Sequence, residues 1–488
     1  MNVVSLRGNI DPSYYRLLMG QETGSLVDTF EAKRPSVAQR LAAGKALRDQ
    51  VPRTAHARYD KHADRPDPVA ILEEQNVTRV QKLVPVRYAR MLASPFSFLR
   101  GSAAVMASDL SRTPVTGLSV GACGDMHVSN FGVYASAERN LVFAINDFDE
   151  IHPGPWEWDL KRLAASAAVA VRFMDGDTVA AEEAARACVR SYRKRMRRYA
   201  DMGHLEVWYD RIDEGAVLGA LSPKVRRNAE RAIAKARGKG HIRSLDRLTE
   251  QVDGEHRIVE DAPLIVRETH SERGRPIREA LNEMLHAYVD SLSVERRRLL
   301  ARYRMVDAAR KVVGVGSVGT ECWVILLQGI DSDDPLFLQV KQAQPSVLAP
   351  YVDLKLAVTN EGHRVVVGQR GAQGSPDILL GWGEVGPGHF YVRQLADMKG
   401  STSFEAGEKG RIGGTIEYCG LCGWALALAH AKTGDPAMIA GYSGNSDALD
   451  DAIARFALAY AKQTEQDHAS LEKARRSGRI EVAAERVA

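Results

Sequence analysis

The most chemically informative residues of this sequence occupy one short stretch. Residues 124–131 read Gly-Asp-Met-His-Val-Ser-Asn-Phe, and after an apolar run residues 146–150 read Asn-Asp-Phe-Asp-Glu. The oxygen atoms of Asn130, Asp147 and Asp149 are ligands that suit hard cations such as Mg²⁺, which often bridge to phosphate oxygens. The stretch therefore predicts a magnesium site that handles phosphate groups.

Within this stretch, the spacing assigns separate roles to the polar residues. Asp125 and Asn130 are five residues apart, the spacing between the catalytic Asp and the metal-binding Asn of kinase catalytic loops. Asp125 is expected to orient the hydroxyl group of an acceptor and take up its proton. Asn130 and Asp147 are expected to bind Mg²⁺, with Asp149 as an additional ligand, and His127 to hydrogen-bond the loop or the transferring phosphate. The alternative is that these residues only shape surface turns.

A second group of candidate residues, for binding a nucleotide, follows much later in the chain. Gly314, Gly316 and Gly319 form a Gly-x-Gly-x-x-Gly motif that also contains Ser317. The run after it is aromatic and β-branched, which favours a strand over the helix that dinucleotide-binding motifs require. Strand, glycine turn and strand is the kinase arrangement, and a plain glycine-rich hairpin is the alternative. Lys341 ends a later apolar strand and matches the kinase lysine that contacts the α- and β-phosphates.

Some further residues have weaker signals. Asp159 stands at the start of an expected helix and is expected to brace the acidic stretch. Arg100 and Arg393 closely follow aromatic residues, and each has two interpretations, contact with phosphate or structural pairing. Arg393 is counted with the glycine motif and Lys341 among the residues expected to bind the nucleotide. The acidic partner that kinases provide for the strand lysine is not identified by the pattern, and the candidates are Glu361, Gln369 and Arg370.

The chemical residues must be positioned by the elements around them. A buried strand is expected at 141–145, between the two halves of the acidic stretch, and a break at 153–155 precedes a helix at 156–173. Further helices are expected at 36–48, 68–82, 84–111 with an interruption near Pro95, 178–199, 223–237, 276–303, 361–372, 415–432 and 447–475. Strands are expected at 311–315, 321–328, 335–340 and 389–395. A β-rich region between two helical regions predicts an α+β fold.

Composition narrows the class of protein. The chain has 488 residues, of which 45% are hydrophobic and 26% charged, with a net charge of +4, so it is long enough for more than one domain and gives no electrostatic reason to expect nucleic-acid binding. No signal peptide or membrane span is expected, and five scattered cysteines favour a cytoplasmic location. Cys419 and Cys422 have metal-like spacing but no second pair nearby, so buried thiols are expected.

The motifs at 124–130 and 146–150, with the Trp-Asp-Leu that follows, resemble those of aminoglycoside phosphotransferases and choline kinases. Those proteins carry a His-Gly-Asp-x-His-x-x-Asn loop and an Ile-Asp-Phe/Trp-Asp/Glu strand end. The resemblance implies a catalytic role for Asp125 and metal binding by Asn130 and Asp147. From about Val84 onward the chain looks like a bacterial family of unknown function with Gly-Asp-x-His-x-x-Asn-Phe-Gly, Asn-Asp-Phe-Asp-Glu and Trp-Asp-Leu-Lys-Arg-Leu-Ala-Ala-Ser motifs.

The order of the motifs departs from that of ordinary kinases, in which the glycine loop and lysine precede the catalytic loop. The resemblance therefore implies a circularly permuted, protein-kinase-like two-lobe fold with a small antiparallel β lobe and a large helical lobe. We expect an N-terminal helical extension at 1–83, a helical lobe with the catalytic and metal-binding loops at 84–304, a nucleotide-binding β-rich lobe at 305–400, and helices that complete the helical lobe at 401–488.

The function expected from these features is an ATP- and Mg²⁺-dependent phosphotransferase that acts on a small hydroxylated acceptor. One alternative is a catalytically inactive regulator that binds ATP. Another is a metal-dependent phosphoesterase, because Asp125-x-His127 resembles a metal-binding pair, although no further histidine motif completes a two-metal site. The sequence leaves open the acceptor, the transfer of phosphate or of AMP, and the oligomeric state.

Overall fold

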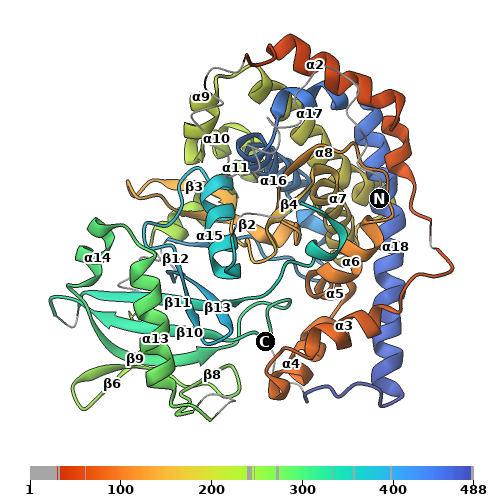
Figure 1. The fold of residues 1–488 in the computed structure, drawn as a ribbon. Coiled ribbons are helices and arrows are strands. Elements are labelled where there is room, and N and C mark those ends of the chain that lie inside the picture. The colour runs from red at the N-terminus through yellow and green to blue at the C-terminus, as the bar shows by residue number, and fades with distance from the viewer. Residues whose placement is uncertain are drawn as a thin grey trace.

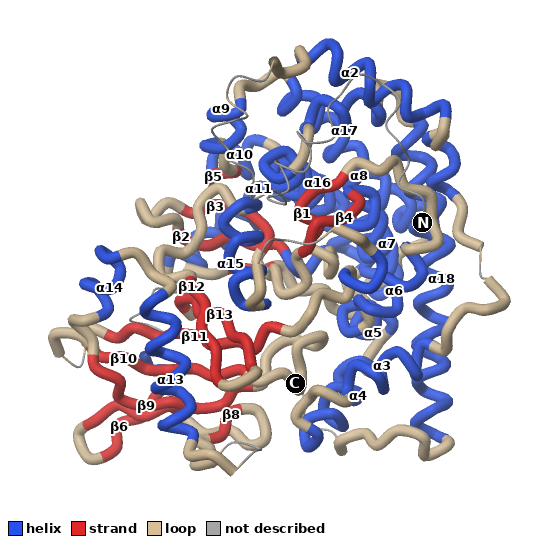
Figure 2. Tube along the Cα trace, viewed as in Figure 1, coloured by secondary structure: helices blue, strands red, loops and turns tan. Residues whose placement is uncertain are grey.

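A computed structural model of the chain describes residues 30, 33–60, 62–238, 245–246, 248–270, 274–331, 333–354, 358–395 and 398–484. The expectations for residues 1–29 lie outside this part of the chain. The fold is mixed α+β, with helices that outnumber the strands and with small antiparallel sheets (Figures 1 and 2). The expected α+β class is therefore confirmed.

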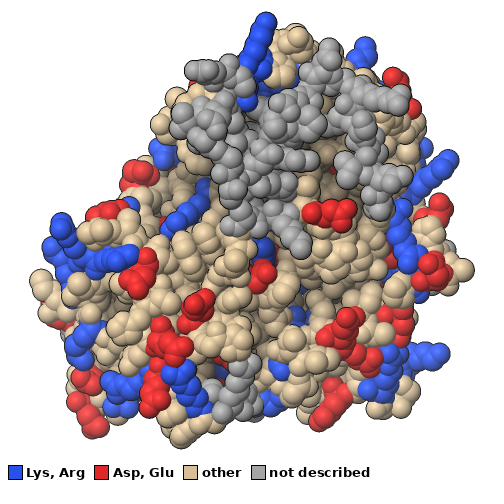
Figure 3. Space-filling model, in the orientation of Figure 1, with Lys and Arg blue, Asp and Glu red and all other residues tan. Residues whose placement is uncertain are grey.

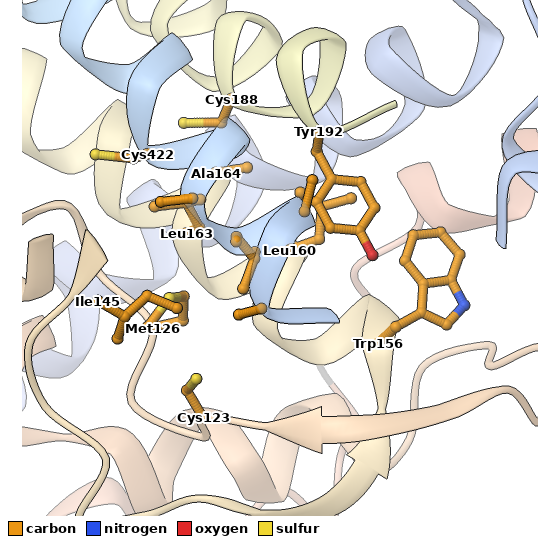
Figure 4. Packing of buried hydrophobic residues seen from close by; sticks show 14 of the residues in the cluster. Cys123, Met126, Ile145, Trp156, Leu160, Leu163, Ala164, Cys188, Tyr192 and Cys422 are labelled. Carbon is orange, nitrogen blue, oxygen red and sulfur yellow. The ribbon is translucent and has the colours of Figure 1, made fainter. Parts of the chain in front are cut away.

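The largest hydrophobic core lies between four helices, α7 (Trp156–Phe173), α8 (Thr178–Ala200), α16 (Ile412–Thr433) and α18 (Ala448–Arg476). Small residues allow these helices to approach closely, and a Cβ on Gly423 of α16 would lie 2.1 Å from a carbonyl oxygen of α8. Figure 4 shows Trp156 at the start of α7 beside Tyr192 of α8, and their rings stack at a centroid distance of 5.7 Å. This core fixes the helix that supports the acidic stretch.

Helix α16 lies in a long apolar segment of the chain. By length and composition, Lys409–Thr433 could cross a membrane, but 67% of its most apolar window is buried inside the fold. Burial of this kind is typical of a core helix in a soluble protein. All five cysteines are free and buried, so the expectation of buried thiols at Cys419 and Cys422 is confirmed.

The main sheet has six antiparallel strands in the order β12-β13-β11-β10-β9-β8. Their bounds are β8 Ile265–Val266, β9 Arg304–Lys311, β10 Cys322–Gln328, β11 Pro335–Ala343, β12 Gly381–Val385 and β13 Gly388–Gln394. Helix α13 (Ile277–Asp290) packs against β12 (Figure 1), and α15 (Glu361–Ala372) connects β11 to β12 along the chain. A hairpin of β6 (Thr249–Val252) and β7 (Glu255–Ile258) adjoins β9.

Some expected elements differ from those observed. The strand expected at 311–315 is wrong, because β9 ends at Lys311 and the apolar Val312 packs instead with Val80 and Leu83. The helix expected at 276–303 is two helices, α13 and α14 (Val294–Leu300), which are separated by residues 291–293. The sheet also includes β8, which precedes the expected start of the β-rich region at 305.

Two smaller sheets frame the acidic stretch. Strands β1 (Ser119–Ala122) and β4 (His152–Pro155) pair with each other, so the Pro-Gly-Pro run forms a short edge strand and not only a break. A four-stranded sheet has the order β14-β2-β3-β5, with bounds Gly400–Ser401, Phe131–Ala135, Leu141–Ile145 and Ile212–Asp213. The pairing of Phe131 with Ile145 in β2 and β3 brings the two halves of the acidic stretch together.

The remaining helices surround these sheets and the core. Helix α17 (Pro436–Ser443) packs on α2 (Val37–Ala46), and α18 contacts both α3 and α4. The other α-helices described are α3 Pro68–Asn76, α4 Val84–Leu92, α5 Pro95–Gly101, α6 Ala103–Leu110, α9 His204–Tyr209, α10 Glu214–Gly219 and α11 Pro223–Arg237. On the face in Figure 3, acidic and basic side chains of the described residues are interspersed, as the small net charge leads one to expect.

Candidate active site

One cavity, which we call the cleft, joins the two sequence regions that carry the candidate residues. Its lining includes Asp125, His127, Asn130, Asp147 and Asp149 from the acidic stretch, and Gly314, Gly316 and Ser317 from the glycine turn between β9 and β10. Two segments that lie far apart in the sequence, residues 125–149 and 314–317, therefore line the same cavity. The lining also includes arginines from the N-terminal helices.

The start of the acidic stretch is held in place by helix α7. Gly124 has a φ of +72°, and a Cβ there would lie 2.9 Å from the Cβ of Glu150, so glycine is required by both conformation and space. The Asp159 carboxylate accepts hydrogen bonds from the backbone N–H groups of Cys123 at 2.6 Å and Gly124 at 2.9 Å. His430 Nε2 lies 3.2 Å from the same carboxylate. Asp159 thus braces the loop, as its position in the sequence predicts.

Asp125 is oriented by an arginine that sequence reasoning did not single out. Arg162 donates to Asp125 Oδ1 from Nε at 3.1 Å and from Nη2 at 2.5 Å, and the Asp125 side chain keeps 24% of its surface exposed. Burial raises the pKa of Asp125, and the opposing charge of Arg162 does not reverse this. Arg162 lies three residues after Asp159 on α7, so the two side chains share one helix face.

His127 lies beside Asp125 without a hydrogen bond between them. Its Nε2 is 3.8 Å from Asp125 Oδ2, which is too long for a hydrogen bond, and its Nδ1 is buried without a partner. Burial, and then the positive charges of Arg100 and Arg162, lower the pKa of His127 well below its usual value. The imidazole is therefore neutral at physiological pH.

The sheet register brings the two expected magnesium ligands together. Asn146 N–H donates to the backbone carbonyl of Asn130 at 2.8 Å, where β2 meets β3. The Asn130 side-chain amide donates to the backbone carbonyl of Asp125 at 2.6 Å, which leaves its Oδ1 as a potential ligand. Asp147 Oδ1 is buried without a hydrogen-bond partner. Burial and the neighbouring charge of Asp149 raise the pKa of Asp147. A cation bound beside Asp147 would stabilise the charged form of this carboxylate.

Lys341 connects the main sheet to the acidic stretch. Its ammonium donates to Asp149 Oδ2 at 2.5 Å and lies 3.6 Å from Asp147 Oδ1, and only 2% of the lysine side chain is exposed. Tyr391 also donates its hydroxyl to Asp149. Burial acts to raise the pKa of Asp149, but Lys341 and Tyr391 outweigh it and lower the pKa to about 2. Asp149 is therefore ionised and paired with Lys341.

None of the three candidates for an acidic partner of Lys341 contacts it. Glu361 accepts from Arg364 within α15, Gln369 donates to Gln373, and Arg370 donates to the carbonyl of Leu380. Asp149 occupies the partner position instead. The expectation failed because it assumed that the partner would come from α15, as the kinase pattern implies.

Helix α15 nevertheless supports the acidic stretch through another residue that sequence reasoning missed. Arg364 donates to the backbone carbonyls of Asp149 at 2.9 Å and Gln344 at 2.8 Å, and also to that of Ile151. The side chain is 3% exposed. Arg364 therefore fixes the acidic stretch against the segment that follows Lys341.

The glycine turn lies directly over Asp125. A Cβ on Gly316 would lie 3.0 Å from the carbonyl oxygen of Arg100 and 3.8 Å from Asp125 Oδ2. Ser317 uses its hydroxyl to bond the Val313 carbonyl at 2.9 Å, which shapes the turn. The turn therefore closes one side of the cleft at the place where transfer chemistry is expected.

The N-terminal helices hold the two ends of the glycine turn. Val80 N–H donates to the Gly319 carbonyl at 2.8 Å, and Arg90 Nη1 donates to the Gly314 carbonyl at 2.5 Å. Gly314 and Gly319 have φ values of +65° and +91°, a region that glycine adopts without strain. Gly319 itself does not line the cleft, so its contribution is to the shape of the turn.

Arg393 does not lie in the cleft where a nucleotide-binding role was expected, and its contacts are structural. Its Nε donates to Gln339 Oε1 at 3.0 Å, and its Nη1 donates to the Asn146 carbonyl at 2.9 Å. It lines a second cavity together with Lys399 and Asp377, and not the cleft. Arg393 thus supports the acidic stretch from outside the cleft.

A metal ion in the cleft would need water or phosphate oxygens as ligands in addition to protein side chains. Over the described ranges, no group of three or more His, Cys, Asp or Glu side chains is arranged to hold a metal ion. The Asp147 oxygen that accepts no hydrogen bond and the Asn130 amide oxygen fit a magnesium ion whose other ligands are water and phosphate oxygens, which is the usual coordination of this ion in phosphate-binding sites.

Comparison with protein families matches residues 79–474 to the model of a family described as an uncharacterized protein conserved in bacteria (DUF2252). This range contains all the residues that line the cleft except Gln75. No curated protein and no solved structure gives a significant match.

Proposed function

We propose that the chain, which belongs to this bacterial DUF2252 family, is an ATP- and Mg²⁺-dependent phosphotransferase that acts on a small hydroxylated acceptor. A cytoplasmic location and a protein-kinase-like, circularly permuted fold are part of the proposal. One observation carries it: Lys341 of the sheet pairs with Asp149 and approaches Asp147, next to a cleft that Asp125, Asn130 and the glycine turn line together.

The order of elements around Lys341 supports the kinase-like fold. Strand β9, the glycine turn and β10 are followed by β11, which carries Lys341 and pairs with β10, and then by α15. Protein kinases likewise have a glycine-rich loop, a lysine on the third strand and a following helix αC. The catalytic loop comes earlier in this chain, but contacts in space, and not chain order, position the residues of a site.

The proposed division of labour follows from the contacts. Asp149 takes one of the three N–H donors of Lys341, and the proposal assigns another to a phosphate oxygen, although the side chain is 2% exposed and does not itself line the cleft. Backbone amides of the glycine turn would hold phosphates from the other side. Asp125, aimed by Arg162 and partly exposed, would orient the acceptor hydroxyl for in-line attack.

Proton transfer and metal chemistry complete the scheme. The raised pKa of Asp125 makes it a better proton acceptor than an ordinary carboxylate. Asn130 and Asp147 would hold the magnesium ion, which when bound neutralises charge on the phosphates. His127, being neutral, could accept or donate one hydrogen bond to the transferring group without adding charge.

A second candidate function is an ATP-binding regulator without transferase activity. The two-point contact between Arg162 and Asp125 favours it, because both hydrogen bonds occupy Oδ1, one of the two oxygens that would otherwise be open to an acceptor hydroxyl. The two candidates differ in turnover and not in ATP binding. Protection of the protein by ATP against thermal unfolding, without turnover of any acceptor, would favour the regulator.

The proposal is tested by calorimetric titration of Mg-ATP into the wild-type chain and into Asp147→Ala. We expect the variant to lose metal-dependent nucleotide binding, since Asp147 is the carboxylate with an unused buried oxygen. Asp331→Ala, which alters an exposed carboxylate in the β10–β11 connection, is the matched control. Equal affinity for Mg-ATP in Asp147→Ala and wild type would contradict the assignment.

A further inference from the structure

Three arginines of the N-terminal helices line the cleft beside the acidic residues. Arg79 follows α3, Arg87 lies on α4 and Arg100 lies on α5. None of them forms an ion pair with a carboxylate of the described chain, and Arg100 makes no hydrogen bond within the described residues. Carboxylates act on them only from a distance, Glu150 on Arg79 and Arg87 and Asp125 on Arg100, so they lack the direct ion pairs that buried arginines usually have.

The contacts of these arginines are all with neutral groups. Arg87 is 1% exposed and donates to Asn76 Oδ1, Gln75 Oε1 and the carbonyl of Gly101. Arg79 donates to the carbonyl of Val318 in the glycine turn at 2.5 Å.

The same guanidinium groups keep unused donors. In Arg79, Arg87 and Arg100 alike, the Nε atom is buried and has no hydrogen-bond partner. Burial lowers the pKa of all three, to about 10 for Arg79. A bound anion would stabilise each of these guanidinium groups.

We propose that Arg79, Arg87 and Arg100 form a phosphate subsite in the cleft, separate from the Lys341 side. The ligand is a phosphate group, either the terminal phosphate of the nucleotide or a phosphate carried by the acceptor. Three guanidinium groups match a dianionic group with several acceptor oxygens, to which arginine binds through two parallel donors. The inference deepens the proposed function, on which it rests for the presence of phosphate chemistry in the cleft.

The position of Arg100 relates this subsite to the transfer chemistry. Its charge acts on both Asp125 and His127, so it lies near the expected acceptor hydroxyl. A Cβ added to Gly316 at the tip of the glycine turn would lie 3.0 Å from the Arg100 carbonyl oxygen, so the turn passes close to Arg100. A phosphate held by Arg100 would therefore lie close to the carboxylate that orients the acceptor.

The test is titration of inorganic phosphate, and separately of Mg-ATP, into the wild-type chain, Arg100→Gln and Arg87→Gln. The control is Arg112→Gln, which removes the same charge from the end of α6, where Arg112 pairs with Asp64 outside the cleft. We expect Arg100→Gln and Arg87→Gln to weaken phosphate binding at least about tenfold, because charge-assisted hydrogen bonds are lost. The control should bind phosphate as the wild type does.

The Mg-ATP titration distinguishes the two sources of phosphate. If Arg100→Gln weakens both ligands, the subsite takes the nucleotide phosphate. If only inorganic phosphate binding is weakened, it takes a phosphate of the acceptor. Unchanged binding of both ligands in Arg100→Gln, or no phosphate and no ATP binding by the wild type, would overturn the proposal.

Thermal unfolding without ligand separates a binding effect from a folding defect. Arg100 has no hydrogen bond to lose, so Arg100→Gln should unfold at the wild-type temperature or above it, even if Arg87→Gln does not fold. Phosphate should raise the unfolding temperature of the wild type and fail to raise that of Arg100→Gln. If the wild type binds phosphate in this way but transfers nothing from ATP, the phosphotransferase proposal fails and the subsite remains.

Discussion

Buried arginines of the helical core and of the cleft are neutralised in different ways. In the core, Arg65 binds Asp109 through two hydrogen bonds and Asp467 through two more, all between 2.6 and 2.9 Å. In the cleft, Arg87 is bound only by neutral acceptors and Arg100 by none in the described chain. The difference shows where the fold satisfies its own charges and where it leaves them for a ligand.

The paired arginines connect segments that are distant in sequence. Arg65 joins the loop before α3 to α6 and α18, and Arg193 of α8 binds Asp450 of α18. Arg162 is intermediate, because it lies at the cleft and yet pairs with a carboxylate, Asp125. The region around Asp125 is therefore the place where the structural and ligand-binding uses of arginine meet, and where substitution should have its largest effect.

Asp125→Asn should abolish phosphoryl transfer and retain ATP binding. The amide keeps the shape of the side chain and can still accept from Arg162, but it cannot take up a proton. We expect kcat to fall about 10³-fold or more, within the range for loss of a general base. A steady-state assay with calorimetry of Mg-ATP binding checks this. A less than tenfold fall in kcat would show that Asp125 is only structural, like the carboxylates of the core.

Arg65→Gln should destabilise the fold far more than Arg100→Gln. Removing Arg65 leaves Asp109 and Asp467 buried without their cation, which costs about 3–5 kcal/mol. Removing Arg100 leaves no carboxylate unpaired, so we expect a change below about 1 kcal/mol without ligand. Urea unfolding of both variants measures the difference. Equal losses would mean that the cleft arginines are structural and that the comparison between the two regions does not hold.

Regular patterns in the sequence predict much of the fold that surrounds the core and the cleft. The strand at 141–145 and the helices at 156–173 and 361–372 have the expected bounds, because apolar periodicity and turn residues define their ends. Strand β12 is not predicted, since its Gly-Trp-Gly sequence resembles a turn. In the structure a Cβ on Gly383 would lie 2.6 Å from the Met284 carbonyl, so glycine is there to let α13 approach the sheet.

Only the part of the candidate site that lies on short loops can be predicted from the sequence. Acid and amide groups with fixed spacing, such as Asp125 and Asn130, can be identified from the sequence because a short loop places them. Arg162 and Arg364 cannot, because each acts through a helix whose packing determines which carbonyl or carboxylate it meets. For Arg87 the sequence also cannot show that no carboxylate of the described chain pairs with it directly, since that depends on every surrounding element.

His56 represents a third way to bury a basic side chain, which is to keep it neutral. It is fully buried, and its Nε2 lies 2.7 Å from the Tyr442 hydroxyl. Burial, with a smaller effect from the charge of Lys161, lowers the pKa of His56 to about 3. The unfolded chain binds a proton at this histidine below a pH of about 6.5, whereas the folded chain does not until pH is near 3.

The contribution of His56 to stability is therefore present above a pH of about 6.5 and is lost as pH falls. We expect about 2–3 kcal/mol of this loss between pH 7 and 4.5, at about 1.4 kcal/mol per pH unit. His56→Gln removes the titrating group and should flatten the dependence by that amount. Urea unfolding of both proteins across this pH range checks it. Parallel curves would show that His56 is charged in the fold, and hence that the protein accepts a further unpaired cation.

The smallest effect on stability is expected for an ion pair at the surface, where water hydrates both charges. Arg172 of α7 pairs with Glu465 of α18 at 3.0 Å, and both side chains are 38% exposed. Exposed pairs of this kind contribute little because hydration and side-chain entropy offset the attraction. Arg172→Gln should therefore lower the free energy of unfolding by less than about 1 kcal/mol, and added salt should reduce even this difference. A loss of unfolding free energy comparable to that of Arg65→Gln would mean that geometry, and not burial, determines how much an arginine pair stabilises this protein. The contrast between the core arginines and the cleft arginines would then need another explanation.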